Sequence, residues 1–244
     1  MTALSVNVNK FALIRNSRGT NHPDLIQICN QILKYGANGI TVHPRPDERH
    51  SKISDLKPIK DIVRNFEKAE FNIEGYPSKK FIKTEINIKP DQVTLVPDPP
   101  NTLTSSFGWD CKKNKDFLSK TVKKFQESNI RVSIFINPSL NTLKNLEYIK
   151  PNRVELYTFN YSKKFKVDKN TAISPYLKIV NFLNNHFPSI ELNAGNYLNT
   201  IILQFFLSQI PTIKEVSIGH AIVCDSIQMG IEKTIKKYLE LSSK

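Results

Sequence analysis

The residues with the clearest capacity for chemistry lie in one short stretch, from His43 to His50. Within these eight positions the chain places two of its five histidines and two arginines. A histidine titrates near neutral pH and can transfer protons, whereas an arginine can bind a phosphate through two parallel hydrogen bonds. The combination predicts proton transfer on a phosphorylated ligand, although a charged, solvated loop would show a similar composition.

A buried β-strand must position this stretch. The preceding residues, 38–42, form a short run with the β-branched side chains typical of a buried strand. We expect the strand to end at His43, because Pro44 and Pro46 cannot donate hydrogen bonds to a neighbouring strand. The same two prolines stiffen the loop that follows.

Strands and helices alternate along the whole chain. The apolar patterns predict strands at about 4–9, 39–42, 71–74, 92–96, 131–136, 153–157, 190–193 and 215–218. They predict helices at about 23–36, 55–66, 78–88, 115–128, 139–148, 168–187, 198–208 and 226–241, with a break near Pro175. Residues 10–21, 97–111 and 158–167 are expected to be loops.

Eight strand–helix units in 244 residues predict an α/β fold: a closed (β/α)8 TIM barrel with parallel strands, in a single domain spanning 1–244. A doubly wound open sheet is the alternative. That fold would be expected to carry a glycine-rich nucleotide motif after its first strand, where this chain has Asn-Val-Asn-Lys at 7–10.

Polar side chains gather where the predicted strands end, which is where TIM barrels place their active sites. The candidates are Asn7, Asn9, Arg18, His43, Arg45, His50, Glu74, Thr104, Glu155, Asn193, Gly195, Asn196, Gly219 and His220. Any one of them could have a structural role, such as a buried glutamate paired with an arginine. Their convergence on one rim predicts an active site there.

The chain also resembles a known family over essentially its whole length. The matching motifs lie at 5–7, 15–20, 39–50, 72–75, 95–97, 155–158, 193–195 and 217–221, and those at 15–20 and 39–50 are specific. The family is that of pyridoxine 5′-phosphate synthase, which closes the pyridine ring of vitamin B6. The resemblance implies condensation of 3-amino-2-oxopropyl phosphate with 1-deoxy-D-xylulose 5-phosphate, release of inorganic phosphate and water, and no metal or organic cofactor.

The resemblance also implies roles for individual residues. His43 and Glu74 would transfer protons, and Glu155 would stabilise a charged intermediate. The ligands of the deoxyxylulose phosphate would be Arg45, His50 and Thr104. The ligands of the aminooxopropyl phosphate would be Asn7, Arg18, Gly219 and His220.

The chain departs from the family pattern at two places. Some relatives have Asp-His where this chain has Asn9 and Lys10, although Lys10 can still serve an anionic substrate. After Asn-Ala-Gly the family usually has a proton-donating histidine, and here that position is Asn196, followed by Tyr197. An amide cannot donate and recover a proton as an imidazole does. We therefore keep Asn9, Lys10 and Tyr197 as substrate-binding candidates, and a catalytically impaired phosphate-binding barrel as the alternative function.

The net charge of +13 leaves open a further functional class, that of nucleic-acid-binding proteins, because such proteins are commonly basic. The lysines are spread along most predicted helices instead of clustering with aromatic residues. We favour compositional drift and anionic substrates over a nucleic-acid partner.

The remaining composition indicates a cytoplasmic protein. The N-terminus lacks the pattern of a signal peptide, and no apolar run approaches the ~20 residues of a membrane span, so we expect no membrane association. Cys29, Cys111 and Cys224 show neither metal-binding spacing nor a disulfide framework, which favours a reducing compartment. The resemblance implies a homo-oligomer.

Overall fold

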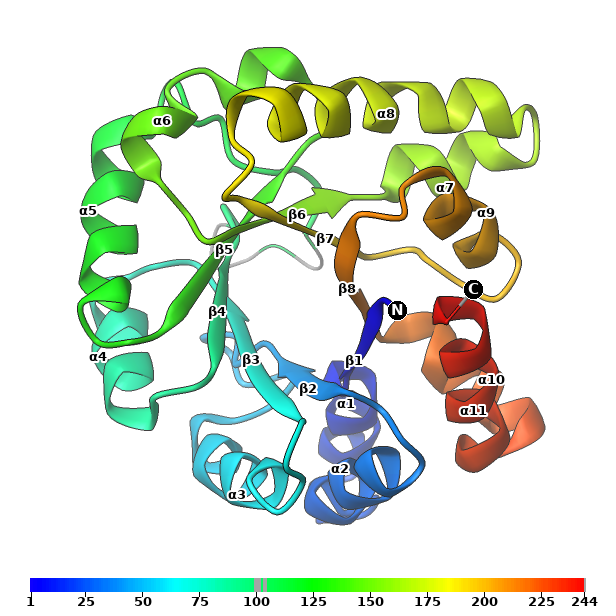
Figure 1. Cartoon of the computed structure of the whole chain (residues 1–244). Helices are drawn as coiled ribbons and strands as arrows, with labels where there is room; N and C mark the ends of the chain where they lie inside the picture. The colour runs from blue at the N-terminus through cyan, green and yellow to red at the C-terminus, as the bar shows by residue number, and fades with distance from the viewer. Residues whose placement is uncertain (99–101, 103–104, 244) are drawn as a thin grey trace.

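The computed structural model describes residues 1–98, 102 and 105–243, and its strands form a closed parallel barrel (Figure 1). Each strand pairs with the next, and the last pairs with the first, so no strand edge is left open. The strands are β1 (Ala3–Asn7), β2 (Gly39–Val42), β3 (Glu70–Gly75), β4 (Gln92–Leu95), β5 (Arg131–Ile136), β6 (Arg153–Tyr157), β7 (Glu191–Gly195) and β8 (Ile213–Ile218). The predicted TIM barrel is confirmed, and the doubly wound sheet is excluded.

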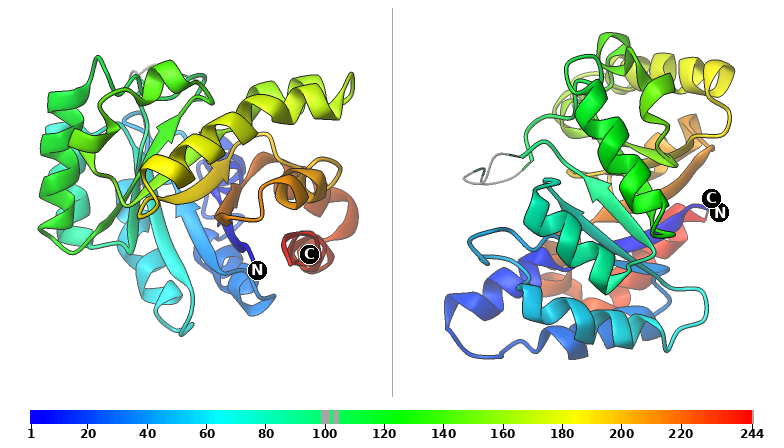
Figure 2. Two further views of the ribbon diagram at one scale, coloured as in Figure 1. Left: turned by 45° about the horizontal axis from the view of Figure 1, so that its top comes forward. Right: turned by 90° about the vertical axis from the view of Figure 1, so that its left-hand side faces the viewer.

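Helices form an outer ring around this barrel (Figure 2). They are α1 (Asn9–Ser17), α2 (Leu25–Lys34), α3 (Ile53–Val63), α4 (Lys79–Ile88), α5 (Lys115–Gln126), α6 (Leu146–Ile149), α7 (Phe159–Phe165), α8 (Lys169–His186), α9 (Leu203–Gln209), α10 (His220–Met229) and α11 (Ile231–Ser242), with a 3-10 turn η1 (Leu140–Leu143). Among the described residues, none of these helices has the length and apolar character needed to cross a membrane.

The strands are buried on both faces because helices cover the outside and side chains fill the inside. Every residue of β2, β4 and β6 is buried, including polar residues such as Thr41, Thr94 and Glu155 that alternate with apolar ones along the strands. The two chain ends meet beside the barrel, where the backbone N–H of Thr2 donates to the carbonyl of Ser242 at 3.2 Å (Figure 1).

Two helices lie where the sequence predicted loops. Residues 9–17 form α1, which buries Phe11, Ala12 and Arg15, and Arg15 makes a two-point ion pair with Asp55 at 2.8 and 2.9 Å. Asn9 therefore begins a helix and does not end a strand. The second is α7, in which Tyr161 is fully buried and donates to the carbonyl of Ile202. Neither segment shows the regularly spaced apolar residues of an amphipathic helix. Polar contacts inside the protein supplement the apolar residues that each segment does bury.

Other helix boundaries also differ from the prediction. Helix α8 continues through Pro175 without a break, because Ile173, Tyr176 and Ile179 are all buried against the barrel. The predicted helix 226–241 is two helices, α10 and α11, separated at Gly230 with φ +79°. The predicted helices 139–148 and 198–208 are shorter, being η1 with α6 and α9 respectively.

The amino end of the barrel is closed by ion pairs. Arg153 donates from Nε to Glu191 Oε2 at 2.8 Å, and its Nη1 lies 3.3 Å from Glu215 Oε2. Arg131 pairs with Glu70 on the neighbouring side. These charges are paired with one another, so the opposite rim is the better candidate for chemistry.

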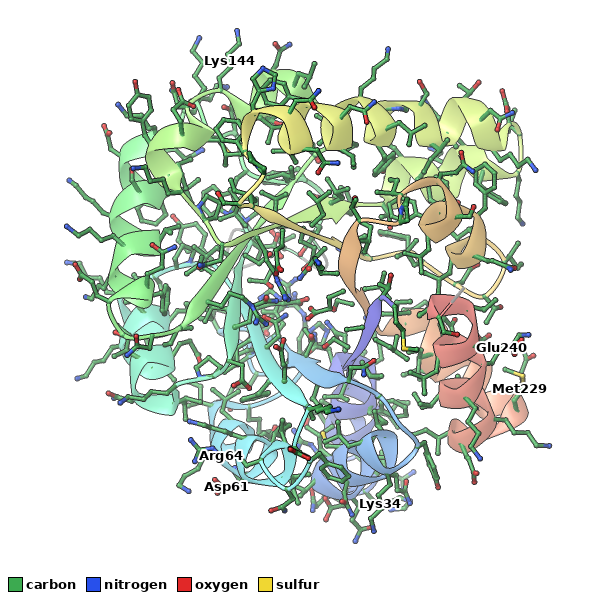
Figure 3. The ribbon with its side chains drawn as sticks, viewed as in Figure 1. Lys34, Asp61, Arg64, Lys144, Met229 and Glu240 are labelled. Atoms are coloured by element: carbon green, nitrogen blue, oxygen red, sulfur yellow. The ribbon has the colours of Figure 1, made fainter. Side chains whose placement is uncertain are left out.

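Basic side chains are distributed around the outer ring. Lys34 on α2, Arg64 after α3 and Lys144 before α6 are all exposed and lie at well-separated points of the circumference (Figure 3). This arrangement agrees with the spread of lysines along the sequence.

Glu85 on α4 is a buried carboxyl that predicts a pH-dependent stability. Its exposed fraction is 1%, its Oε2 finds no hydrogen-bond partner among the described residues, and burial raises its pKa from 4.5 to about 8. Between these two values the unfolded chain loses the proton that the folded chain retains. The free energy of unfolding should therefore fall as pH rises across this window, by at most about 1.4 kcal/mol per pH unit.

We expect Glu85→Gln to remove this contribution to the slope, as measured by urea unfolding at pH 5, 6.5 and 8. The control is Glu127→Gln, which changes an exposed carboxyl at the end of α5 and should retain the wild-type slope. An unchanged pH dependence in Glu85→Gln would show that the Glu85 carboxyl is ionised in the folded protein.

Candidate active site

Glu74 lies at the centre of the carboxyl-end rim, on β3. The amide of Asn7, at the end of β1, donates to Glu74 Oε2 at 3.2 Å, and His43 Nδ1 lies 3.6 Å from the same oxygen. Burial raises the pKa of Glu74 to about 7, while Arg45 opposes this shift and Asp98 adds to it. A carboxyl with this pKa can take up or release a proton near neutral pH.

His43 is the first residue after β2, as predicted, and it is held from both sides. Its backbone N–H donates to Asn9 Oδ1 at 2.8 Å, which fixes the point where the strand ends. Burial, followed by the positive charge of Arg45, lowers the pKa of His43 to about 3. The imidazole is therefore neutral at physiological pH and can accept a proton from a ligand or relay one.

Arg45 links the loop after β2 to the loop after β4. Its Nη2 donates to Asp98 Oδ2 at 2.8 Å and its Nη1 donates to the carbonyl of Thr102 at 3.0 Å. Asp98 Oδ2 also accepts from Ser105 Oγ at 2.7 Å. Arg45 and Asp98 are almost fully buried, with exposed fractions of 4% and 2%.

Further basic groups crowd around this pair. Burial and, after it, the positive charge of the nearby Lys10 together lower the pKa of His50 to about 3. Burial and the charges of Arg49 and Arg45 likewise lower the pKa of Lys10. Because these groups weaken one another's protonation, the pocket is suited to an anion that would offset their charge.

Glu155 on β6 adds a second buried carboxyl. Burial, with the neighbouring Glu74 and Glu215, raises its pKa well above the ordinary value, which favours its neutral form. A Cβ atom at Gly195 would lie 2.0 Å from Glu155 Oε1. The glycine of the Asn-Ala-Gly motif is therefore needed to make room for this carboxyl.

The backbone after β7 adopts a strained conformation. Asn196 and Tyr197 both have positive φ angles, +65° and +52°, and the Thr158 hydroxyl contacts the carbonyls of Gly195 and Asn196. Asparagine tolerates this region better than most residues, whereas tyrosine does not. Consecutive left-handed residues at a strand end are a feature of functional sites.

The β8 end meets the β1 end. A Cβ atom at Gly219 would lie 2.8 Å from the carbonyl oxygen of Asn7, so only glycine fits there. His220 begins α10, is exposed, and its Nε2 lies 3.5 Å from Cys224 Sγ. Gly219 and Asn7 therefore form one wall of the site, with His220 at its edge.

Three predicted residues need separate comment. Arg18 lies at the end of α1, and its side chain is exposed. It takes no part in the hydrogen bonds and ion pairs given above for the described residues of the rim. Asn193 does not face the rim: its amide donates to Glu215 Oε1 at 3.3 Å, which belongs to the network at the amino end. Thr104 lies outside the described residues.

Sequence reasoning missed Asp98, which accepts hydrogen bonds from Arg45 and Ser105 in the site. The signal was present, because Asp98 is an acidic residue three positions after the end of β4, in a loop at the carboxyl-end rim. A cavity of about 420 Å³ opens beside Asp98, lined by His43, Arg45, Asp98, Phe81 and Glu85 among others.

Within the described residues, no three metal-binding side chains gather at a common point.

The fold is that of a TIM barrel, and its carboxyl-end rim is suited to acid–base chemistry on anionic ligands. Comparison with known proteins identifies the family. Residues 4–244 match the family described as "Pyridoxal phosphate biosynthesis protein PdxJ", and the chain belongs to this family.

Curated relatives agree with this assignment. The chain is 44% identical to the pyridoxine 5′-phosphate synthase of Parabacteroides distasonis over 238 residues, covering 98% of each chain. It is also 44% identical to the enzyme of that name from Cytophaga hutchinsonii over 239 residues, again covering 98% of each. The predicted activity, the synthesis of pyridoxine 5′-phosphate in vitamin B6 biosynthesis, is thereby confirmed.

Solved structures with little sequence similarity share the fold alone. A putative fructose-1,6-bisphosphate aldolase from Coccidioides immitis superposes with a TM-score of 0.63 at 9% identity, covering 99% of this chain and 89% of the other. Such a likeness supports the barrel architecture and carries no information about substrates.

Proposed function

We propose that this rim condenses 3-amino-2-oxopropyl phosphate with 1-deoxy-D-xylulose 5-phosphate, yielding pyridoxine 5′-phosphate, inorganic phosphate and water without a metal or organic cofactor. The observation that carries the proposal is the buried contact between Glu74 and His43 beside a crowded basic pocket. Ring closure requires repeated proton transfers on phosphorylated carbonyl compounds. The rim offers proton-transfer groups and anion-binding groups within one enclosure.

Glu74 and His43 would carry the proton transfers. Glu74 can act as a general base when ionised and as an acid when protonated, because its pKa is about 7. His43 is neutral in the free site, and a bound phosphate would offset the Arg45 and Arg49 charges that help to lower its pKa. With substrate bound, it would accept a proton in imine formation and enolisation and return it when phosphate leaves. Each positioned group of this kind contributes roughly 10²–10⁴-fold to the rate.

Separate groups would bind the two phosphates. Arg45, His50 and Lys10 form the basic pocket assigned to the deoxyxylulose phosphate, in which neutral His50 would donate an N–H. Gly219 and His220, at the N-terminus of α10, with Asn7 beside them, would bind the aminooxopropyl phosphate, because backbone N–H groups at a helix start favour anions. The roles of Arg18 and Thr104 rest on the resemblance alone.

Glu155 would stabilise a cationic intermediate. Burial, and then the charges of Glu74 and Glu215, raise its pKa and favour its neutral form. A protonated imine forming nearby would favour its ionised form, so the carboxyl would respond to the intermediate and not to the substrate. Asn9 would act indirectly by fixing the backbone of His43, and Tyr197 would line the edge of the site.

We also propose a cellular compartment, an oligomeric state and the absence of macromolecular partners of other classes. The three cysteines are free, with Cys224 exposed, which suits a reducing cytoplasm. A homo-oligomer is supported by exposed apolar side chains on two adjacent helices, Leu13 and Ile14 on α1 and Ile227 and Met229 on α10. We infer no nucleic-acid or membrane partner.

Incubation with both substrates tests the proposed function directly. We expect pyridoxine 5′-phosphate and inorganic phosphate to appear in equal amounts, followed by absorbance and by phosphate release. Omitting either substrate should abolish both signals. Phosphate release without formation of the pyridine ring would contradict the proposal.

Glu74→Gln should abolish turnover and leave the fold intact, because glutamine retains the shape and hydrogen bonds but cannot carry a proton. In the wild type, the rate should rise as pH increases through about 7, since the ionised form of Glu74 is the base. Steady-state kinetics from pH 5.5 to 9, with circular dichroism of the variant, provide the measurement. A near-normal kcat in Glu74→Gln would assign Glu74 a structural role.

Arg45→Ala should weaken binding of the deoxyxylulose phosphate far more than binding of the aminooxopropyl phosphate. Loss of a charge-assisted fork costs on the order of 1.5–3 kcal/mol, or roughly ten- to a hundredfold in affinity. Calorimetric titration with each substrate separately gives the two values. Arg64→Ala, which removes an exposed arginine of the outer ring (Figure 3), is the control. Equal losses for both substrates would refute the separation of the two phosphate sites.

Asn196→His should raise kcat, because it restores a proton donor at the position where the family usually has histidine. Histidine is compatible with the left-handed backbone at this position. His220 is assigned to phosphate and Tyr197 is largely exposed, so we infer that water supplies this proton slowly in the wild type. The gain can reach the ~10²–10⁴-fold typical of a positioned acid, with little change in substrate Kd.

Single-turnover rates of the wild type, Asn196→His and Asn196→Gln across pH 5.5–9 test this inference. Asn196→Gln keeps an amide and should not gain activity. If the wild type already matches the rate and pH profile of Asn196→His, the donor lies elsewhere in the site.

A further inference from the structure

Asp98 is the buried acidic residue that ties two loops of the rim together. Its Oδ2 accepts from Arg45 in the loop after β2 and from Ser105 in the loop after β4, at 2.8 and 2.7 Å. Arg45 completes the bridge by donating to the carbonyl of Thr102. A single carboxylate oxygen thus holds a guanidinium and a hydroxyl that come from loops on different strands.

The bridge leaves two buried polar atoms unused. Arg45 Nε and Asp98 Oδ1 each lack a hydrogen-bond partner among the described residues, and both side chains line the cavity of about 420 Å³ together with His43. Buried donors and acceptors are nearly always satisfied in folded proteins. Because both side chains line the cavity, a ligand bound there would lie beside the Arg45–Asp98 pair.

The orientation of the guanidinium is what Asp98 controls. A guanidinium has five N–H donors in one plane, and it binds a phosphate well only when its N–H edge points at the phosphate oxygens. The contacts to Asp98 and Thr102 use one N–H of Nη2 and one of Nη1, which fixes the plane and leaves the second N–H of each nitrogen for a ligand oxygen. Without the carboxylate, the long side chain would be free to turn away.

We propose that Asp98 is a positioning residue for the condensation: it fixes the guanidinium of Arg45 toward the phosphate of the ketose substrate, and the Ser105 hydroxyl braces the same carboxylate oxygen. This inference rests on the proposed function, because it takes the ketose phosphate as the ligand of Arg45. Asp98 touches neither Glu74 nor His43 directly, and its negative charge acts on both at a distance.

The negative charge of Asp98 provides a second test, which is independent of substrate affinity. The negative charge of Asp98 raises the pKa of Glu74, as it does that of His43. Asp98→Asn keeps the shape and a hydrogen-bond acceptor but removes the charge. The pKa of Glu74 should therefore fall, and the acid limb of the pH–rate profile should move to lower pH.

The experiment compares Asp98→Asn with Glu191→Gln, which neutralises the partner of Arg153 at the opposite end of the barrel. Isothermal titration measures the Kd of 1-deoxy-D-xylulose 5-phosphate and of 3-amino-2-oxopropyl phosphate, and steady-state kinetics measure KM and kcat across pH. For Asp98→Asn we expect Kd and KM of the ketose phosphate to rise about tenfold or more, a loss of about 1.4 kcal/mol. Affinity for the other substrate should stay unchanged, and Glu191→Gln should alter neither.

Unchanged ketose affinity, equal losses for both substrates, or a fixed acid limb would each overturn the proposal. Should Asp98→Asn fail to fold, Ser105→Ala replaces it, because this variant keeps the Arg45 pair and loses only the loop contact. A severalfold loss of ketose affinity with an unmoved acid limb then supports the proposal, and no loss overturns it.

The titrations separate this inference from the proposed function. A wild type that binds the ketose phosphate but forms no product would contradict the proposed function, while the role of Asp98 would still be decided by the Kd values. A wild type that binds neither substrate would overturn both.

Discussion

Closure of the barrel by the pairing of β8 with β1 is the constraint on which the site depends. This pairing brings Gly219 against Asn7, which in turn reaches Glu74 across the end of β2. Residues separated by more than 200 positions thereby form one wall. The ion pairs of Arg153 and Arg131 close the other end of the barrel, so the carboxyl-end rim is left as the place where polar side chains can meet a ligand.

Desolvation then sets the chemistry of that rim. Burial acts in opposite directions on acids and bases, raising the pKa of Glu74 to about 7 and lowering that of His43 to about 3. In water a glutamic acid would give its proton to an imidazole, but in this site the proton stays on Glu74 and the neutral pair is favoured. Burial also leaves the basic pocket around Lys10 and His50 without its full counter-charge, and an anionic substrate can supply what is missing.

Loops supply the specificity that the barrel strands cannot. The loop after β2 presents His43, Arg45 and His50, and its position depends on contacts from other segments, such as the amide of Asn16, which donates to the carbonyl of His50 at 2.7 Å. The left-handed backbone at Asn196 and Tyr197 likewise depends on another loop, because the Thr158 hydroxyl contacts the carbonyls of Gly195 and Asn196.

The sequence by itself determined the eight strand–helix units, the strand ends at which polar residues collect, and the motif from 39 to 50, because hydrophobic periodicity and proline punctuation act over a few residues. It did not reveal α1, whose burial depends on an ion pair from Arg15 to Asp55, 40 positions away. Only the tertiary structure showed that Asn193 belongs to the opposite end of the barrel, that burial raises the pKa of Glu155, and that Arg45 is held by Asp98 across 53 positions. Hydrogen-bond partners and pKa values depend on which distant groups share a desolvated space, and that is decided when the barrel closes.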